Sequence, residues 1–452
     1  MNTPICDFVN QYAKSGSVRL HMPGHKGKSF FGCERYDINE IDGADSLYAA
    51  DGIIYESERN ASLLFGTRAT LYSTEGSSQC IRAMLYLALL SFKMKHRGIR
   101  PVVIAARNAH KAFLTAAALL DFDIEWLFPE NNDYSLCRCE ISAKQLERTI
   151  DNTENIACVY VTSPDYLGNC LDISRLAGVS HKKGLPLLVD NAHGAYLRFL
   201  TDCAHPIALG ADICCDSAHK TLPSLTGGAY LHISASAPAV FYEKARTAMA
   251  LFGSTSPSYL ILQSLDRVNK YIADGYSARL EATVNKAVAL KARLYENGWR
   301  FAGSEPLKLT LDARRYGYTG DLVAGELQQH GIICEYADRD YVVFMLTPEV
   351  TDDELKRLET ALMRFEKRQP IAVNNPEFQK PELAISVREA LFMPSETVDV
   401  GNAVGRIVAS LAVSCPPAIA PAVPGERINE STAYYFKYYN VDTISVVCEA
   451  KK

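Results

Sequence analysis

Two short polar stretches, each at the end of an apolar run, supply residues that could do chemistry. The first spans residues 189–193 and the second spans residues 217–220. Each is expected at the carboxyl end of a strand, where open α/β sheets bind ligands. Lys220 in such a place can form a Schiff base with an aldehyde cofactor, because partial burial favours the neutral, nucleophilic amine. Asp190 could keep the ring nitrogen of a pyridine cofactor protonated, which makes the ring an electron sink.

Each of these residues also has a purely structural interpretation. A single lysine after a strand is more often a solvated loop residue, and a single aspartate there is more often a helix cap. The combination favours the functional interpretation, because Ser217, His193 and His219 are expected at the same sheet edge as Lys220 and Asp190.

A phosphate-binding turn is indicated by residues 73–79, which immediately precede a helical stretch. Gly76 permits a close backbone approach, Ser77 and Ser78 bring hydroxyl groups, and the helix N-terminus favours an anion. The segment lacks the lysine of a P-loop, so a nucleotide site of that type is not expected. A Ser/Gly helix cap without a ligand is the alternative, since serine is among the most frequent N-cap residues.

His110 follows another apolar run and opens the next helical stretch. Its flat imidazole could stack on a planar ring, although a lone histidine in this position is more often structural. His21 and His25 have the i, i+4 spacing of a metal pair, but Pro23 and Gly24 break the helix that would align them. We therefore expect no metal site.

The elements that must position these residues follow an alternating strand and helix pattern. Continuous apolar runs predict strands buried on both faces, at 101–105, 124–128, 156–162, 185–190, 212–215 and 229–233. Helices are predicted between them, at 77–95, 111–120, 143–150 and 172–183. This order predicts an α/β fold: a large domain with a mostly parallel sheet wrapped by helices.

A smaller α+β C-terminal domain is predicted after about residue 275. Its helices are expected at 276–297, 321–330 and 353–365, the last with Thr351 as N-cap, and its strands at 307–311, 332–336 and 341–346. We expect an N-terminal arm (1–55), a large cofactor domain (56–275) and a C-terminal region (276–452).

Composition excludes several classes of protein. The 452 residues are 48% hydrophobic with a net charge of −5, which is ordinary for a globular protein and gives no sign of a nucleic-acid-binding face. The uncharged stretch 407–425 is interrupted by four prolines, so a buried loop or strand is expected rather than a membrane span. The 13 cysteines are spread without paired or zinc-site spacing, and the start lacks the apolar core of a signal peptide. Reduced thiols in the cytoplasm are therefore expected, with a single regulatory disulfide as the alternative.

In this order, the motifs resemble the Orn/Lys/Arg decarboxylase family of fold-type-I pyridoxal-phosphate enzymes. The resemblance covers nearly the whole chain, from His21-Met-Pro-Gly-His-Lys-Gly27 onward. It continues through 36–48, 73–79, 107–111, 162–168, 189–199, 217–223 and 255–266, and ends with Cys415-Pro-Pro417 and Val423-Pro-Gly-Glu426. Because the signature begins at residue 21, we expect a compact form without the N-terminal wing domain of longer relatives.

The resemblance implies a role for each candidate residue and a pyridoxal 5'-phosphate (PLP) cofactor. Lys220 would be the Schiff-base lysine, Asp190 the partner of the pyridine nitrogen, and His110 the stacking residue. His193 would lie beside the ring, and the phosphate would be held by Gly76, Ser77, Ser78, Ser217 and His219. Ser256 would reach the phosphate of a neighbouring subunit, which implies a homodimer with shared sites or a higher homo-oligomer. Glu335 would lie near the mouth of the site.

The implied activity is decarboxylation of a basic amino acid, arginine, lysine or ornithine, to CO2 and a polyamine-type amine. His219 or Lys220 would return the proton to Cα, and Glu335 or a partner residue between Asp45 and Glu58 would bind the distal nitrogen. The alternatives are an aminotransferase or lyase on the same fold, or a non-catalytic PLP-binding regulator. Three positions depart from the family pattern: Glu75 replaces a common Asn, Asn191 a common Glu, and Gly227-Gly228 a usual Gln-Ala.

Overall fold

The structure, a computed structural model, describes residues 1–130, 136, 138–372, 375–411 and 419–448. The chain forms two compact units. The first comprises residues 1–104, 146–163 and 172–278, and the second comprises residues 105–145, 164–171 and 279–452.

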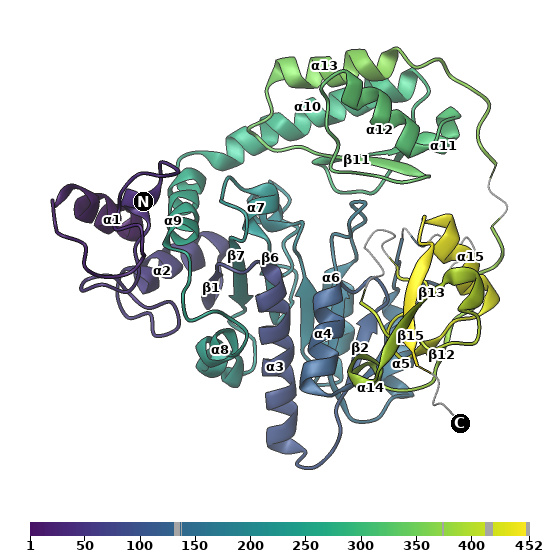
Figure 1. Ribbon diagram of the computed structural model, residues 1–452, viewed down its shortest axis with the longest axis horizontal. Coiled ribbons are helices and arrows are strands. Elements are labelled where there is room, and N and C mark those ends of the chain that lie inside the picture. Colours follow the sequence, from purple (N-terminus) through teal and green to yellow (C-terminus); the bar gives the residue numbers. More distant parts are fainter. Residues whose placement is uncertain (131–135, 137, 373–374, 412–418, 449–452) are drawn as a thin grey trace. The chain divides into compact units, whose positions relative to one another are not determined.

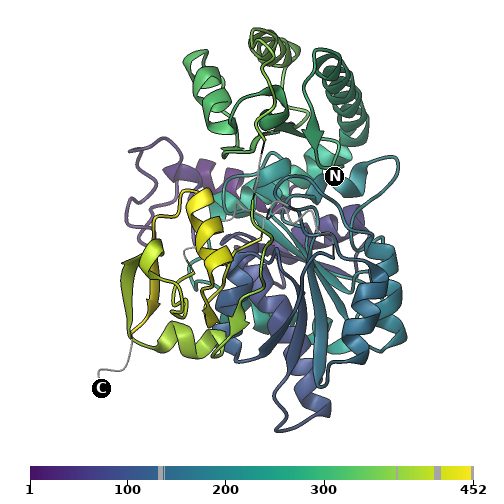
Figure 2. The same ribbon diagram turned by 90° about the vertical axis from the view of Figure 1, so that its right-hand side faces the viewer.

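A seven-stranded sheet has the order β1-β7-β6-β5-β4-β2-β3, and Figure 2 shows helices on both sides of its strands. The strands are β1 (Ala69–Ser73), β2 (Val102–Ala106), β3 (Asp123–Leu127), β4 (Ile156–Thr162), β5 (Leu187–Asp190), β6 (Ile213–Asp216) and β7 (Ala229–Ile233). β4, β5 and β6 are parallel, whereas β7 runs antiparallel to β6 and β1. The predicted α/β fold with a mostly parallel sheet is confirmed.

The register of these strands decides which polar residues meet. Asp190 at the end of β5 pairs with Cys215 of β6. Tyr230 of β7 pairs with both Asp216 of β6 and Tyr72 of β1. The carboxyl ends of β1, β5 and β6 therefore lie at one edge of the sheet, and the segments that follow them share that edge.

Several helices of the first unit pack against strands of this sheet (Figure 1). The long helix α3 (Ser77–Lys95) packs against β4, β5, β6 and β7, and most of its apolar residues are buried. The others are α1 (Pro4–Lys14), α2 (Ile53–Phe65), α6 (Ile173–Lys182), α7 (Ala218–Thr221), α8 (Ala239–Leu251) and α9 (Tyr259–Ala273), while α5 (Ala143–Asp151) and α10 (Tyr276–Glu296) each cross a boundary between units. Two short 3₁₀ turns lie at Glu34–Tyr36 and Ala195–Phe199.

The second unit contains a four-stranded antiparallel sheet of order β10-β11-β9-β8. Its elements are β8 (Phe301–Ala302), β9 (Lys308–Asp312), α11 (Ala313–Tyr316), α12 (Gly320–Gln329), β10 (Tyr336–Ala337), β11 (Tyr341–Met345) and α13 (Asp352–Met363). The Thr351 hydroxyl caps α13 in a capping box with Glu354, as the sequence predicts for Thr351. Trp299 is completely buried and stacks on Tyr316 of α11, with 3.9 Å between the ring centroids.

One predicted strand of this sheet is wrong. The sequence predicts a strand at 332–336, but only Tyr336 and Ala337 form one. The amide of Ile332 instead bonds to Leu327 at the end of α12, and Ile333 is 74% exposed. Most of this apolar run is therefore a loop.

The remainder of the second unit has its own small core. It contains α4 (Lys111–Leu120), β12 (Glu382–Leu383), α14 (Val387–Phe392), β13 (Ser395–Asp399), a 3₁₀ turn (Val400–Asn402), β14 (Glu426–Arg427), α15 (Glu430–Tyr438) and β15 (Thr443–Val447). Val400, Val408, Phe436 and Val446 are completely buried there. Within the described residues, no helix is long and apolar enough to cross a membrane. Cys415, Pro416 and Pro417 lie outside the described residues.

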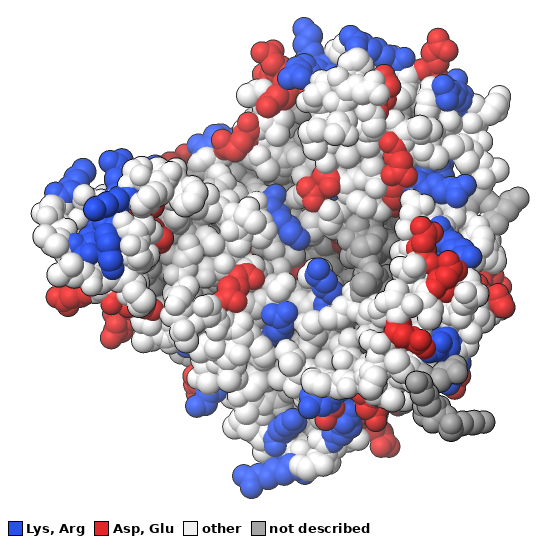
Figure 3. All heavy atoms as spheres, in the orientation of Figure 1, with Lys and Arg blue, Asp and Glu red and all other residues white. Residues whose placement is uncertain are grey.

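Surface charge is mixed. On the face shown in Figure 3, Lys and Arg side chains alternate with Asp and Glu side chains and form no continuous basic band.

A buried ion pair ties the C-terminal residues to the segment after β2. The Arg107 guanidinium donates to both carboxylate oxygens of Glu426, at 2.7 and 2.6 Å, and both side chains are almost fully buried. The guanidinium also lies 4.9 Å from the ring centres of Trp126 and Phe128. A bidentate, desolvated pair of this kind fixes geometry strongly.

We predict that Arg107→Ala is strongly destabilising, because it leaves the Glu426 carboxylate buried without its cation. Removal of one partner of a buried pair costs about 3–5 kcal/mol of unfolding free energy. Urea unfolding followed by circular dichroism measures the change. Arg175→Ala, which removes an 80% exposed cation beside Asp172, is the control and should cost less than about 1 kcal/mol. Equal effects of the two variants would contradict the prediction.

Candidate active site

Lys220 and His193 meet at the edge where β5 and β6 end. Lys220 lies in the single-turn helix α7 that follows β6, and His193 lies three residues beyond β5. The Lys220 amine is 3.0 Å from Nε2 of His193, with His193 buried and Lys220 partly exposed. A lysine amine beside an imidazole can exchange a proton with it, so the pair can serve both as a nucleophile and as a proton carrier.

Asp190 is buried at the end of β5, as the sequence predicts. Its carboxylate accepts hydrogen bonds from the Tyr160 hydroxyl at 3.2 Å, the Ala192 amide at 3.1 Å and the Cys215 thiol at 3.7 Å. Burial, and then the charge of Asp190, raise the pKa of the Tyr160 hydroxyl well above its ordinary value, so Tyr160 remains a donor. Three donors leave a carboxylate, with about four acceptor positions, able to accept one more hydrogen bond.

The predicted phosphate-binding turn joins β1 to α3. Gly76 has φ +72°, a conformation that glycine adopts readily, and an added Cβ would meet no protein atom within 4 Å. Among the described residues, no side chain caps α3. The Ser217 hydroxyl donates to the Ser77 hydroxyl at 2.8 Å, so the turn and the segment after β6 are in contact. Ser78 lies partly exposed in the first turn of α3.

Gly227 and Gly228 lie in the backbone segment that contacts this turn. The Gly227 carbonyl accepts from the Gly76 amide at 2.8 Å, and an added Cβ on Gly227 would approach the Thr74 carbonyl to 2.9 Å. The Gly228 carbonyl is 2.9 Å from Nδ1 of His219. Glycine at position 227 thus allows two backbone segments to approach closely, and the main-chain carbonyl of residue 228 contacts the His219 ring.

Asn191 directs its amide into the protein interior. It donates from Nδ2 to the Asp216 carboxylate at 2.6 Å, and its side chain is buried. Asp216 also faces the two buried histidines His205 and His232. Sequence reasoning missed this cluster and Tyr160, since Tyr160 and His232 lie within apolar runs that indicate only a buried core.

Three other residues that the sequence predicts for the site lie in segments of their own. His110 caps α4 in the second unit, where its Nδ1 accepts from the Ala112 amide at 3.2 Å. Glu335 of the same unit is exposed and accepts from the Tyr166 hydroxyl at 2.7 Å. Ser256 is exposed in the segment before α9, and within that segment the Ser254 amide donates to Glu75. Stacking by His110 and substrate contact by Glu335 remain predictions.

The signature histidines have different partners. Nε2 of His21 is 2.6 Å from the Tyr12 hydroxyl, and Nε2 of His25 is 3.3 Å from the Asp37 carboxylate. The two rings therefore have different hydrogen-bond partners.

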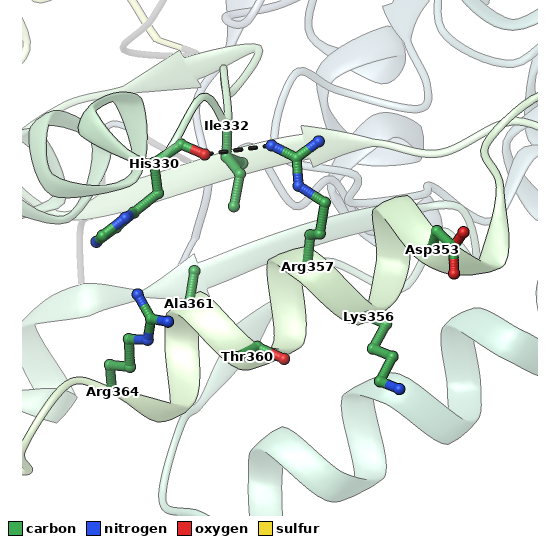
Figure 4. A pocket seen from close by; sticks show the side chains of 8 residues that line it. All are labelled: His330, Ile332, Asp353, Lys356, Arg357, Thr360, Ala361 and Arg364. Atoms are coloured by element: carbon green, nitrogen blue, oxygen red, sulfur yellow. Dashed lines mark hydrogen bonds between the residues drawn. The ribbon is translucent and has the colours of Figure 1, made fainter.

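A surface pocket in the second unit is unrelated to the predicted residues. It lies between α13 and the end of α12, with the Arg357 guanidinium donating to the His330 carbonyl at 3.3 Å (Figure 4). Its lining consists of His330, Ile332, Asp353, Lys356, Arg357, Thr360, Ala361 and Arg364. No residue of the predicted site belongs to it.

The residues at the sheet edge fit PLP. A buried carboxylate with spare acceptor capacity suits a protonated ring nitrogen, and the open N-terminus of α3 beside two serine hydroxyls suits a phosphate. Lys220 lies on the segment between these two features and supplies the amine that an aldehyde requires.

Comparisons with known proteins identify the family to which the chain is similar. A family model described as Orn/Lys/Arg decarboxylase, major domain, matches residues 3–311, and a model of the C-terminal domain of the same family matches residues 376–444. Arginine decarboxylase of Halalkalibacterium halodurans is 28% identical over 97% of this chain and 93% of the relative. Arginine decarboxylase of Bacillus subtilis is 28% identical over 96% of this chain and 93% of the relative.

Solved structures show the same fold. The constitutive lysine decarboxylase of E. coli has a TM-score of 0.78 at 17% identity, covering 99% of this chain and 82% of that one. The lysine decarboxylase of Francisella novicida has a TM-score of 0.80 at 19% identity, covering 99% and 81%.

We predict that Lys220→Ala abolishes covalent attachment of PLP. Incubation with PLP followed by borohydride reduction should add one cofactor to the peptide that contains Lys220 in the wild type and none in the variant. Peptide mass spectrometry makes the measurement. Lys270→Ala, which changes an exposed lysine of α9, should retain the label at Lys220. A label of equal yield on another lysine in Lys220→Ala would contradict the assignment.

Proposed function

Because the chain belongs to the Orn/Lys/Arg decarboxylase family, we propose that it is a PLP-dependent decarboxylase of a basic amino acid, with arginine as the first candidate. The observation that carries the proposal is the contact of Lys220 with His193 at the sheet edge that also holds Asp190. The choice of arginine is supported by the activity in the names of the two bacterial relatives, which match the chain over nearly its full length.

Each residue at the edge has a proposed task. Lys220 binds the cofactor aldehyde, Asp190 accepts the ring N–H, and Ser77, Ser78 and Ser217 bind the phosphate at the start of α3. His219 borders the phosphate site, and His110 is proposed to stack on the ring. When bound, PLP supplies an electron sink that stabilises the carbanion left by loss of CO2.

Proton transfer falls to Lys220. After CO2 leaves, Cα needs a proton, and the Lys220 amine can carry one at Nζ. His193 lies 3.0 Å from that atom and can replace the proton. Nδ1 of His219 faces the Gly228 carbonyl at 2.9 Å, which holds the ring in one orientation. We therefore favour Lys220 over His219 as the proton donor.

The distal nitrogen of a basic substrate requires a carboxylate. Glu335 is exposed, and its hydrogen bond from Tyr166 orients it. In the range that the sequence offers for a partner residue, Asp45 accepts backbone amides at the start of α2, and Glu58 is buried in a 2.6 Å ion pair with Arg246. Glu335, together with the exposed Asp51 and Glu56, therefore remains the better candidate.

We predict that the purified protein with PLP releases CO2 from L-arginine faster than from L-lysine or L-ornithine. Mass spectrometry of the amine product and trapping of 14C-labelled CO2 make the measurement, with Lys220→Ala as the inactive control. A keto-acid-dependent loss of amino groups without CO2 would instead indicate an aminotransferase. Bound PLP without turnover of any basic amino acid, including carboxylated polyamines, would indicate a non-catalytic regulator.

We also propose a homodimer with shared active sites, in the cytoplasm. The segment between α1 and the first 3₁₀ turn exposes large apolar side chains, which are costly to leave in water. They are Val18 (82% exposed), Leu20 (88%), Met22 (67%), Phe30 (74%) and Phe31 (93%). An identical subunit is the proposed partner, and the exposed Ser256 would then reach the phosphate of that subunit.

We predict that the double substitution Phe30→Ser and Phe31→Ser converts the dimer into monomers, since it removes the two aromatic anchors of this segment. Size-exclusion chromatography with light scattering gives the mass of each form. Val288→Ser on α10, a residue that is 56% exposed, is the control and should leave the dimer intact. An unchanged dimer in the double variant would show that this segment is not the interface.

A further inference from the structure

A completely buried carboxylate, Asp216, lies next to the candidate active-site residues Asn191 and Ser217. Asp216, the last residue of β6, has no exposed surface and accepts three hydrogen bonds from side chains. Nε2 of His205 and Nε2 of His232 lie 3.0 and 3.1 Å from one of its oxygens. The Asn191 amide donates to the other oxygen at 2.6 Å.

These three donors keep Asp216 charged. Burial alone would raise its pKa, but the two imidazoles outweigh burial and hold the pKa of Asp216 below its usual range. Burial lowers the pKa of His232, so its ring is neutral and donates from Nε2. Nδ1 of His232 lies 2.9 Å from the Thr70 hydroxyl, which fits the same tautomer. The cluster is thus an anion held by three N–H groups.

The cluster touches the active site at two places. Asn191 follows Asp190 directly, and its backbone amide donates to the Cys215 carbonyl at 3.0 Å, so its position is coupled to that of Asp190. Ser217 follows Asp216 directly and donates to Ser77 in the phosphate-binding turn. The Asn191 side chain itself points to Asp216 and occupies the space that a Cβ on Gly194 would need.

We propose that Asp216 is a positioning residue, which acts through Asn191 and Ser217 to place Asp190 and the phosphate-binding turn. On this proposal, position 191 carries an amide and not a carboxylate because the Asp216 carboxylate needs a hydrogen-bond donor there. This inference rests on the proposed PLP site. On this view, Asn191 departs from the family pattern because it makes a buried hydrogen bond to Asp216, and not because the substrate contact has changed. A glutamate at position 191 in this chain would place a second carboxylate against Asp216.

The same three side chains, His205, Asp216 and His232, have the composition of a metal site, the single such group found within the described residues. Each Nε2 already lies at hydrogen-bonding distance from the one Asp216 oxygen, with Asn191 on the other oxygen. A hydrogen-bonded anion accounts for all of these contacts, and metal analysis of the purified protein belongs in the test.

Exchange of the two partners is the sharpest experiment. Asn191→Asp opposes two buried carboxylates and should weaken PLP binding about tenfold or more and lower the melting temperature. Asp216→Asn in the same chain restores one donor and one acceptor and should recover most of both losses. PLP retention after gel filtration, the visible absorbance and circular dichroism of bound PLP, and thermal unfolding are measured for each form.

Two controls separate positioning from general packing. Asn191→Ala removes the donor without adding charge, so Asp216→Asn should not rescue it. Asn269→Asp places a carboxylate at another buried asparagine, whose amide donates to Tyr72 and Ser57, and it should not be rescued either. If Asn191→Asp is insoluble, solubility and PLP binding of the exchanged double variant constitute the rescue.

Three results would overturn the inference. They are wild-type PLP binding by Asn191→Asp, a double variant no better than Asn191→Asp, or one bound metal ion per chain that His205→Ala removes. Rescue of the melting temperature without rescue of the PLP spectrum would also overturn the positioning role. Absence of PLP binding by the wild type would instead reject the proposed function, so the two failures are distinguishable.

Discussion

The parallel register of β5 and β6 is the constraint on which the candidate site depends. Because Asp190 pairs with Cys215, the residues that follow each strand emerge side by side. Asp190 is the last residue of β5, and Ser217 directly follows the last residue of β6. Both residues therefore reach the edge of the sheet without a long loop. The antiparallel strand β7 then brings the end of β1, and with it the phosphate-binding turn, to the same edge.

The two buried carboxylates at this edge each have their own set of hydrogen-bond donors. Asp190 has donors from Tyr160, Ala192 and Cys215, and Asp216 has donors from Asn191, His205 and His232. Two carboxylates end neighbouring strands, and each would be costly to bury alone. The separate donor sets stabilise both carboxylates, which a pyridine partner and a positioning anion both require.

Much of the architecture could be predicted because its signals are local. The run 77–95 and the strands 156–162 and 229–233 have the bounds that apolar character and the preceding glycine indicate. Helix 111–120 and the Thr351 cap follow in the same way. The strand expected at 332–336 failed because apolar character alone does not say whether another element will cover it, and Ile333 remains 74% exposed.

The site was predictable only in part, for a different physical reason. Lys220, Asp190 and the glycine–serine turn carry chemistry in their own residue type and place after a strand. Tyr160 and His232 lie in the middle of apolar strands, so their roles depend on which strand lies beside them. The role of Asp216 likewise depends on its contact with His205, which lies in a loop eleven residues earlier in the chain.

The three departures from the family pattern can be interpreted only from the contacts that each residue makes in the structure. Gly227 permits the close approach to Thr74 that shapes the turn, and Glu75 accepts the Ser254 amide from the segment proposed to reach the neighbouring subunit. Asn191 matches a charged Asp216. Each departure lies in a segment next to the proposed cofactor site, and none replaces Lys220, Asp190 or the serines proposed to bind the phosphate. The residues to which we assign the chemistry are therefore unchanged, and the departures lie in the segments around them.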